Sequence, residues 1–223
     1  MKAIIHGKTI LPDKEENFTI RRGLVLLFDG NIRDILTEEE FAALPQGSVN
    51  ETIDADGCYV SPGFLNVHIH GCVGADTMDD DPEAIHKMQL FQAKTGVTSF
   101  LPTTMTYDFK TLDRAFTHVR EAMERHDGAR VLGCHMEGPF ISPAKKGAQA
   151  EKNIAKANFA KIAPYKDIVR IITVAPEKLH DDGRFIADCL KNNIVVSLGH
   201  TAADYDTARK AIETYGASHI THL

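Results

Sequence analysis

The sequence has no basic excess, no long apolar run and no signal peptide, and each absence excludes a class of protein. Its 25 lysines and arginines are outnumbered by 31 aspartates and glutamates, and the net charge of −6 argues against a nucleic-acid partner. No stretch approaches the roughly 20 apolar residues that cross a bilayer, so no membrane partner is expected. The N-terminal residues lack the pattern of a signal peptide, and a cytoplasmic location is therefore the expectation.

Cysteine is also scarce, and the four that occur lie far apart without a CxxC pair. Reduced thiols are therefore expected, each packed as a small buried side chain, at Cys58, Cys72, Cys134 and Cys189. With 43% hydrophobic and 25% charged residues, the chain otherwise has the composition of an ordinary globular protein.

Two segments of different character follow one another along the chain. Residues 1–56 hold short β-rich stretches separated by turn signals and carry no chemical motif, so we interpret them as a small β-rich domain, an incomplete β-sandwich. Residues 57–223 alternate between strands and helices. Strands are predicted over 64–70, 97–101, 130–137, 168–175, 194–200 and 219–223. Amphipathic helices are predicted over 82–95, 109–123 and 205–215.

This alternation implies an α/β fold with a parallel sheet, since parallel strands need long crossover connections. Six strands could form an open doubly wound sheet or an incomplete (β/α)8 barrel of the TIM type. The glycine-rich GxGxxG loop of dinucleotide-binding folds is missing, which removes the main support for the open sheet. The positions of the polar residues favour the incomplete barrel.

Residues able to bind a metal recur where the predicted strands end. His68 and His70 close the first strand, Glu137 the third, His200 the fifth and His222 the sixth. Side chains two apart on a strand point the same way, and the C-terminal strand ends of a barrel converge on one face. A single histidine at such a place is more often structural. Ligands at four strand ends, in order, predict a site for zinc or another first-row divalent metal.

The other histidines are interpreted as structural or surface residues. His135 shares the strand face of Glu137, so we expect it to point into the barrel, either as core or beside the metal ligands. His219 is expected to face the helices, because its position along the strand is out of phase with that of His222. Surface positions are expected for His86, His118, His126 and His180.

Motifs at and between these strand ends resemble a known family. Pro62-Gly63-Phe64 followed by His68-Ile69-His70-Gly71 is similar to the first-strand signature of the amidohydrolase superfamily. Five further motifs resemble one branch of that superfamily, the N-acetylglucosamine-6-phosphate deacetylases. They are HMEGPF at 135–140, KKGAQ at 145–149, VAPE at 174–177, LGHT at 198–201 and THL at 221–223. The likeness covers nearly the whole chain, in order and with sensible spacing.

The resemblance implies a (β/α)8 barrel and a small β-sandwich that a C-terminal segment completes. It also implies a divalent metal, with Zn²⁺ expected and Fe²⁺ or another first-row ion as alternatives. Glu137, His200 and His222 would hold one ion, and His68 and His70 would give room for a second. The implied reaction hydrolyses the N-acetyl group of N-acetylglucosamine 6-phosphate, a small phosphorylated amino sugar, to glucosamine 6-phosphate and acetate. The full-length protein would be a homodimer.

The resemblance further implies substrate contacts from Ala148 and Gln149, in the loop after Glu137. The general acid and base would be an aspartate beyond Leu223, so no catalytic residue is expected in this chain. We therefore expect a truncated sequence in which two barrel strands are missing and turnover is low. Asn66 stands where many superfamily members have an aspartate, and an amide brings no charge to the metal ligands.

Two other functions stay open at this stage. Another amidohydrolase, such as a cyclic amidase or a nucleobase deaminase, would use the same metal ligands. Many cyclic amidases carry a metal-bridging lysine at the end of the fourth strand, where this sequence has Val174-Ala175-Pro176-Glu177 instead. The other alternative is a non-catalytic protein or fragment that has the metal ligands but lacks the proton-transferring aspartate.

Overall fold

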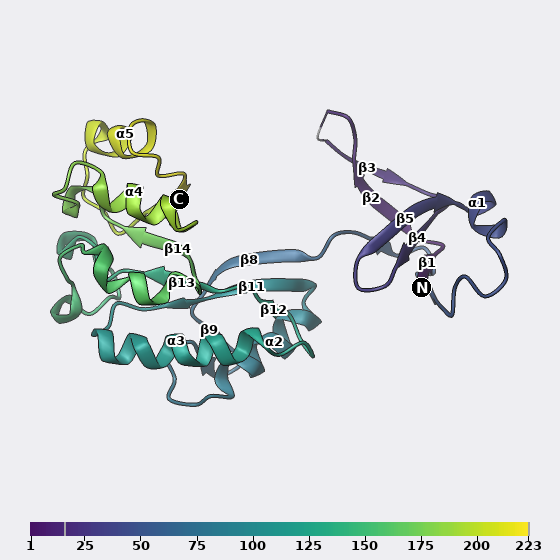
Figure 1. The fold of residues 1–223 in the computed structure, drawn as a ribbon, viewed down its shortest axis with the longest axis horizontal. Helices are drawn as coiled ribbons and strands as arrows, with labels where there is room; N and C mark the ends of the chain where they lie inside the picture. The colour runs from purple at the N-terminus through teal and green to yellow at the C-terminus, as the bar shows by residue number, and fades with distance from the viewer. Residues whose placement is uncertain (16, 223) are drawn as a thin grey trace. The chain divides into compact units, whose positions relative to one another are not determined.

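The computed structural model describes residues 1–15 and 17–222, which fall into two compact units, Met1–Pro62 and Gly63–Leu223. The division comes after Pro62, later in the chain than the boundary expected after residue 56. The first unit is rich in strands, and the second alternates strands with helices, as the ribbon in Figure 1 shows.

The N-terminal unit consists of two small sheets and one short helix. Its elements are β1 (Lys2–Ile5), β2 (Lys8–Pro12), β3 (Phe18–Arg21), β4 (Leu24–Phe28), β5 (Ile32–Thr37), α1 (Glu38–Ala42), β6 (Glu51–Asp54) and β7 (Tyr59–Val60). The strand orders are β5-β4-β1-β6 and β3-β2-β7. Ala3, Val25 and Leu27 form its small buried core, against which Phe41 of α1 packs. Thr37 and Glu40 form a capping box that fixes the start of α1.

The second unit carries the parallel sheet. Its elements are β8 (Phe64–Ile69), β9 (Gly71–Cys72), β10 (Ala75–Asp76), α2 (Ala84–Lys94), β11 (Val97–Thr104), α3 (Phe109–Met123), β12 (Arg130–Val131), β13 (Cys134–Glu137), β14 (Val169–Val174), α4 (Arg184–Lys191), β15 (Val195–Leu198), α5 (Tyr205–Glu213) and β16 (His219–Ile220). Short 3-10 turns lie at Pro143–Lys145, Glu151–Asn153, Phe159–Lys161, Ala163–Tyr165 and Pro176–Lys178.

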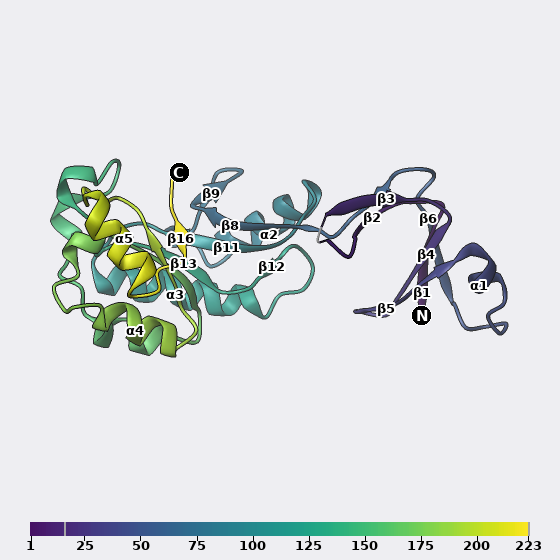
Figure 2. The same cartoon turned by 90° about the horizontal axis from the view of Figure 1, so that it is seen from above.

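The main sheet has the order β12-β11-β13-β14-β15-β16, with β8 also paired to β11, and every pairing within it is parallel. Its six main strands, β8, β11, β13, β14, β15 and β16, curl into half of a barrel. Figure 2 shows the same sheet from above, with α3, α4 and α5 beside it. The prediction of an incomplete (β/α)8 barrel with a β-rich N-terminal part is confirmed, because parallel strands joined by crossover helices curl into part of a barrel after a strand-rich unit.

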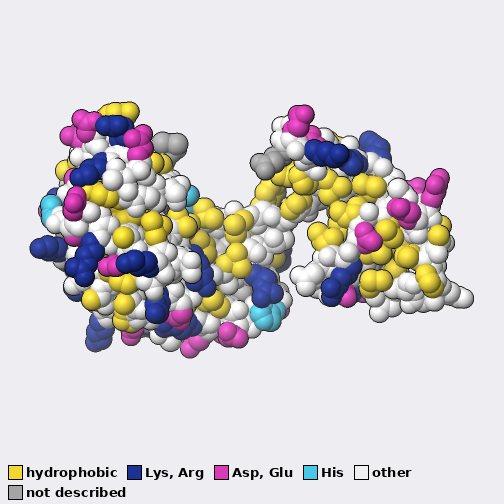
Figure 3. All heavy atoms as spheres, turned by 45° about the horizontal axis from the view of Figure 1, so that its top comes forward, with side chains coloured by type: hydrophobic (Ala, Val, Ile, Leu, Met, Phe, Trp, Pro, Cys, Tyr) yellow, Lys and Arg dark blue, Asp and Glu magenta, His cyan; other side chains and the backbone are white. Residues whose placement is uncertain are grey.

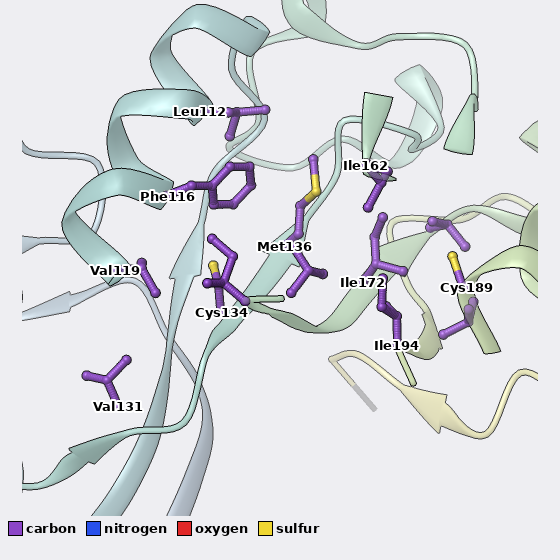
Figure 4. Close-up of a cluster of buried hydrophobic side chains, with 14 of the residues drawn as sticks. Leu112, Phe116, Val119, Val131, Cys134, Met136, Ile162, Ile172, Cys189 and Ile194 are labelled. Atoms are coloured by element: carbon purple, nitrogen blue, oxygen red, sulfur yellow. The ribbon is translucent and has the colours of Figure 1, made fainter. Parts of the chain in front are cut away.

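The core of this unit lies between the sheet and its helices. Leu112, Phe116 and Val119 of α3 point toward Cys134 and Met136 of β13, as the close-up in Figure 4 shows. Their spacing of three and four residues gives α3 one apolar face. Asp108 caps the helix by accepting hydrogen bonds from the backbone N–H groups of residues 110 and 111. Because successive strand residues alternate, His135 and Glu137 must lie on the opposite face of the sheet from this core.

That opposite face is the inside of the half-barrel, and part of it is open. Leu65, Leu132 and Val195 are exposed there, around a cavity of about 390 Å³. Figure 3 shows further hydrophobic side chains gathered on the surface of each unit. None of the helices in residues 1–15 and 17–222 has both the length and the apolar character of a membrane span.

Candidate metal centre

The structure brings all five predicted ligands together around one carboxylate. Glu137 is the last residue of β13 and is buried, with 1% of its surface exposed. Its Oε1 lies 2.9 Å from Nε2 of His222, 3.2 Å from Nε2 of His200 and 3.7 Å from Nε2 of His68. Its Oε2 lies 3.2 Å from Nε2 of His70. Four imidazoles from three other strand ends therefore surround a single buried acid.

Two backbone carbonyls decide which ring nitrogens face this acid. Nδ1 of His200 lies 2.9 Å from the carbonyl oxygen of Lys145, and Nδ1 of His70 lies 3.1 Å from that of Thr103. A carbonyl can only accept, so each Nδ1 carries the proton and donates it. In the neutral rings, both Nε2 atoms then direct a bare lone pair at the carboxylate of Glu137.

The Nε2 lone pairs and the carboxylate of Glu137 are all acceptors and repel one another. The arrangement therefore requires a positive charge between them. Within the described residues, Oε1 of Glu137 is buried and has no hydrogen-bond donor. A buried, charged carboxylate oxygen without a donor is costly to the folding free energy. Either protons on the imidazoles or a metal ion can supply the missing charge, and a metal ion satisfies all the lone pairs at once. The donor set therefore fits a divalent metal with imidazole and carboxylate ligands.

The close approach of the imidazoles to Glu137 also shifts the pKa values of these groups. Burial raises the pKa of Glu137, but protonated His200 and His70 can donate to it. Together with the positive charge of His200 and His68, they outweigh burial and hold that pKa well below its usual range. The contact with Glu137 raises the pKa of His200. For His70, burial lowers the pKa, and Glu137 more than offsets this effect. In His68 burial prevails and lowers the pKa.

Two of the histidines owe their direction to unusual backbone. His200 and His222 follow the ends of β15 and β16, and their φ angles are +49° and +60°. Left-handed backbone is uncommon for a residue with a side chain and occurs often at functional sites. The turn takes each ring out of the alternation of its strand and toward Glu137. The alternation of side chains along a strand therefore does not predict where either ring points.

A cavity of about 470 Å³ opens beside His200 and His222 and is bordered by Lys145. This volume lies within the usual range for a small-molecule site. Its position next to two of the candidate ligands would put a bound molecule beside the metal centre.

Comparison with known proteins agrees with this geometry. A profile of the amidohydrolase family matches residues 59–223. The chain belongs to this family. The amidohydrolase family generally binds a divalent metal, which accords with the cluster of His68, Glu137 and His222, whose ligand atoms all lie within 4.8 Å of one another.

Relatives within the amidohydrolases are sugar-phosphate deacetylases. The chain is 36% identical to an N-acetylglucosamine-6-phosphate deacetylase of Bacillus subtilis over 219 residues, 93% of this chain and 53% of the relative. It is 33% identical to an N-acetylgalactosamine-6-phosphate deacetylase of Escherichia coli O157:H7 over 176 residues, 76% of this chain and 46% of the relative. The crystal structure of an N-acetylglucosamine-6-phosphate deacetylase from Pasteurella multocida superposes with a TM-score of 0.85 at 31% identity, over 99% of this chain and 56% of that one. The chain spans about half the length of these relatives.

The loop after β13 supplies a neighbour that the sequence had indicated only as a substrate contact. Gln149 is buried, and its Nε2 donates to Oε2 of Glu137 across 2.5 Å, while its Oε1 accepts from the backbone N–H of Thr106. Ala148, predicted with it to contact substrate, is exposed on this loop. Asn66 hydrogen-bonds to groups other than the ligand rings: its Oδ1 accepts from the backbone N–H of His68, and its Nδ2 donates to Oε1 of Gln92.

Predictions about three residues need correction. His219 does not face the helices: its Nδ1 bonds to Oγ of Ser197, on the inner face of the sheet. The prediction assumed that His219 and His222 lie on one strand with alternating side chains. It failed because β16 ends at Ile220, before His222. Cys58 is exposed rather than buried, and Cys72 is only partly buried.

Sequence reasoning missed the polar residues beneath the ligands, which are Thr103, Thr173, Ser197 and Thr221. They are threonines and serines at inward strand positions, where an ordinary barrel interior would carry branched apolar side chains. That deviation from the expected pattern was the available signal.

Proposed function

We propose that this chain carries the metal centre of a deacetylase that hydrolyses N-acetylglucosamine 6-phosphate to glucosamine 6-phosphate and acetate. One observation carries the proposal: the buried carboxylate of Glu137 faces the bare Nε2 lone pairs of His200 and His70. Only a bound cation relieves that arrangement without protonating the rings. Relatives at 33–36% identity over most of the chain, all named as sugar-phosphate deacetylases, support the choice of reaction.

Glu137, His200 and His222 would hold the principal ion, which we propose to be Zn²⁺, and His68 and His70 would hold a second. A bound Zn²⁺ lowers the pKa of its water toward about 7 and polarises an amide carbonyl. The chain's own residues orient this centre: the carbonyls of Lys145 and Thr103 fix two imidazoles, and Gln149 fixes the carboxylate. The sugar would occupy the cavity beside His200, which Lys145 and Gly147 border. Contacts from Ala148 and Gln149, which lie outside the lining of this cavity, stay a prediction. The aspartate that transfers protons remains a prediction for residues after Leu223.

The partner and the location belong to the same proposal. We expect the whole protein to act on a small phosphorylated amino sugar as a cytoplasmic homodimer, without nucleic acid or membrane. The acidic balance of the chain supports only the absence of a nucleic-acid partner, because nucleic-acid binders usually carry a basic excess. Light scattering and cell fractionation test the dimer and the location.

Acetate release by the purified full-length protein tests the activity, with Zn²⁺ added or with a chelator. We expect release from N-acetylglucosamine 6-phosphate, slower release from N-acetylgalactosamine 6-phosphate, and no reaction with dihydroorotate or adenine. The Escherichia coli relative makes the second sugar the alternative substrate. His200→Asn should abolish turnover, and His126→Asn, at an exposed histidine outside the metal centre, should leave it unchanged. Faster turnover of dihydroorotate or adenine than of either sugar phosphate would overturn the proposal.

A further inference from the structure

A line of buried polar side chains crosses the inner face of the sheet beneath the metal centre. Nε2 of His135 lies 2.7 Å from Oγ1 of Thr173, which lies 2.8 Å from Oγ1 of Thr221. Oγ1 of Thr221 lies 2.6 Å from Oγ of Ser197, which lies 2.9 Å from Nδ1 of His219. At the other end, Nδ1 of His135 lies 2.8 Å from the carbonyl oxygen of residue 67. We call these five side chains the inner polar chain.

The carbonyl of residue 67, at one end of the inner polar chain, determines the direction of every hydrogen bond in it. The carbonyl of residue 67 can only accept, so His135 donates from Nδ1 and, as a neutral ring, must accept at Nε2. Thr173 therefore donates its only hydroxyl proton to His135 and must accept a hydrogen bond from Thr221. By the same step, Thr221 accepts from Ser197, and Ser197 accepts from His219. All the donors point one way, and no hydroxyl is free to reverse without breaking a bond.

The neutral state of His135 agrees with its surroundings. Its ring is fully buried, and burial disfavours the charged form of an imidazole. Its ring stands edge-on to that of His68, with centroids 4.8 Å apart. The same side chain therefore touches one candidate ligand and lies two residues before another, Glu137.

Each strand that carries or leads into a candidate ligand supplies either a member of the inner polar chain or the carbonyl at its end. The carbonyl of residue 67 lies on β8 directly before His68, and His135 lies on β13 with Glu137. Ser197 lies on β15, which leads into His200, and Thr221 immediately precedes His222. Thr173, in the middle, lies on β14, which carries no ligand. Gly199 leaves the room for these contacts, because a Cβ there would lie 2.7 Å from Cβ of Thr221 and 2.8 Å from Cγ2 of Thr173.

We infer that the inner polar chain is a positioning device that sets the register of the four ligand-bearing strand ends and so sets the metal affinity of the centre. Thr173 is its central positioning residue: it pairs with Glu137 across β13 and β14, and its hydroxyl bonds to His135 and Thr221 rather than to a candidate ligand. A hydrogen-bonded network with fixed directions has one low-energy arrangement, whereas apolar side chains of the same shape would allow the strand ends to shift. The inference rests on the proposed metal centre but not on the proposed substrate.

Thr173→Val tests the inference, because it keeps the shape of the side chain and removes only the hydroxyl. The control is Thr104→Val on β11: Thr104 is equally buried, and its Oγ1 has no hydrogen-bond partner in the part of the chain that the structure describes. Zn²⁺ affinity is measured on folded, metal-free protein by competition with a chromophoric chelator. We expect about a tenfold loss of Zn²⁺ affinity in Thr173→Val, the lower end of the effect of residues behind metal ligands. We expect no change in Thr104→Val.

A second variant at Thr173 distinguishes a positioning role from a general loss of stability. Thr173→Ser restores the hydroxyl without the methyl group and should recover the Zn²⁺ affinity even if its unfolding midpoint stays lowered. Should Thr173→Val fail to fold, Ser197→Ala removes the donor to Thr221 and should weaken Zn²⁺ by a similar factor. Unchanged affinity in Thr173→Val, an equal loss in Thr104→Val, or no recovery in Thr173→Ser each overturns the inference and leaves the deacetylase proposal standing. Absence of Zn²⁺ binding by the unmodified protein overturns both.

Discussion

The side-chain amide of Gln149 holds the carboxylate of Glu137 from the side away from His200 and His222. Its Nε2 donates to Oε2 of Glu137 across 2.5 Å, and its Oε1 accepts from the backbone N–H of Thr106 across 2.6 Å. Both side chains are buried, so neither group can exchange its partner for water. The amide thus fixes the rotation of the carboxylate and leaves Oε1 directed at the two histidines.

We expect Gln149→Leu to lower the free energy of unfolding of the metal-free protein by about 1–3 kcal/mol, because it leaves two buried polar groups without partners. Gln149→Glu should cost more, since it sets a second carboxylate against Glu137. Urea unfolding with a chelator present measures both, with Gln46→Leu, at an exposed glutamine of the N-terminal unit, as the control. A Gln149→Leu protein that unfolds at the unmodified midpoint would show that the amide does not hold the carboxylate.

Zn²⁺ should stabilise the fold through Glu137. At a free concentration a hundredfold above the dissociation constant, binding adds about 2.7 kcal/mol to the free energy of unfolding. For a chain of this length, that corresponds to a rise of roughly 5–10 °C in Tm. Glu137→Gln removes the negative charge at the centre of the four imidazoles and should abolish the rise, while His126→Asn should keep it. Thermal scans with and without Zn²⁺ measure this, and a full rise in Glu137→Gln would falsify the role given to the carboxylate.

The sequence predicted the elements well where one apolar pattern governs them. Helix α3 occupies the predicted residues 109–123, because its apolar spacing and its Asp108 cap are both local. Helix α4 was not predicted, since its eight residues are too few for a clear period. The last strand was predicted over 219–223 but ends at Ile220, where the chain turns toward Glu137.

The candidate ligands could be predicted because strand ends of a barrel converge, which is a property of the whole fold. What orients them could not. The tautomers of His70 and His200 depend on the carbonyls of Thr103 and Lys145, which lie 33 and 55 residues away along the chain. No local pattern indicates the left-handed backbone of His200 and His222, since tertiary contacts hold it.

Gly199→Ala should disturb the inner polar chain by crowding. The new methyl group would meet Thr221 and Thr173 at under 3 Å, and overpacking of this kind costs about 1–3 kcal/mol of unfolding free energy. Adding Thr173→Ser removes one of the two clashing atoms, so the double variant should lose less than the sum of the single losses. Urea unfolding of the four proteins in this cycle measures the coupling. Strictly additive losses would mean that Gly199 does not pack against Thr173 in solution.

The cysteines should differ sharply in reactivity. Burial raises the pKa of Cys134 and Cys189 to about 12, whereas Cys58 is exposed. The thiolate is the reactive form, so near pH 8 only roughly one in ten thousand of the buried thiols can react, and access is blocked as well. We expect iodoacetamide to label Cys58 first, the partly buried Cys72 more slowly, and the two buried thiols only after unfolding in urea. Mass spectrometry of peptides after timed alkylation measures each site, and labelling of native Cys134 at the rate of Cys58 would contradict the packing of β13 against α3.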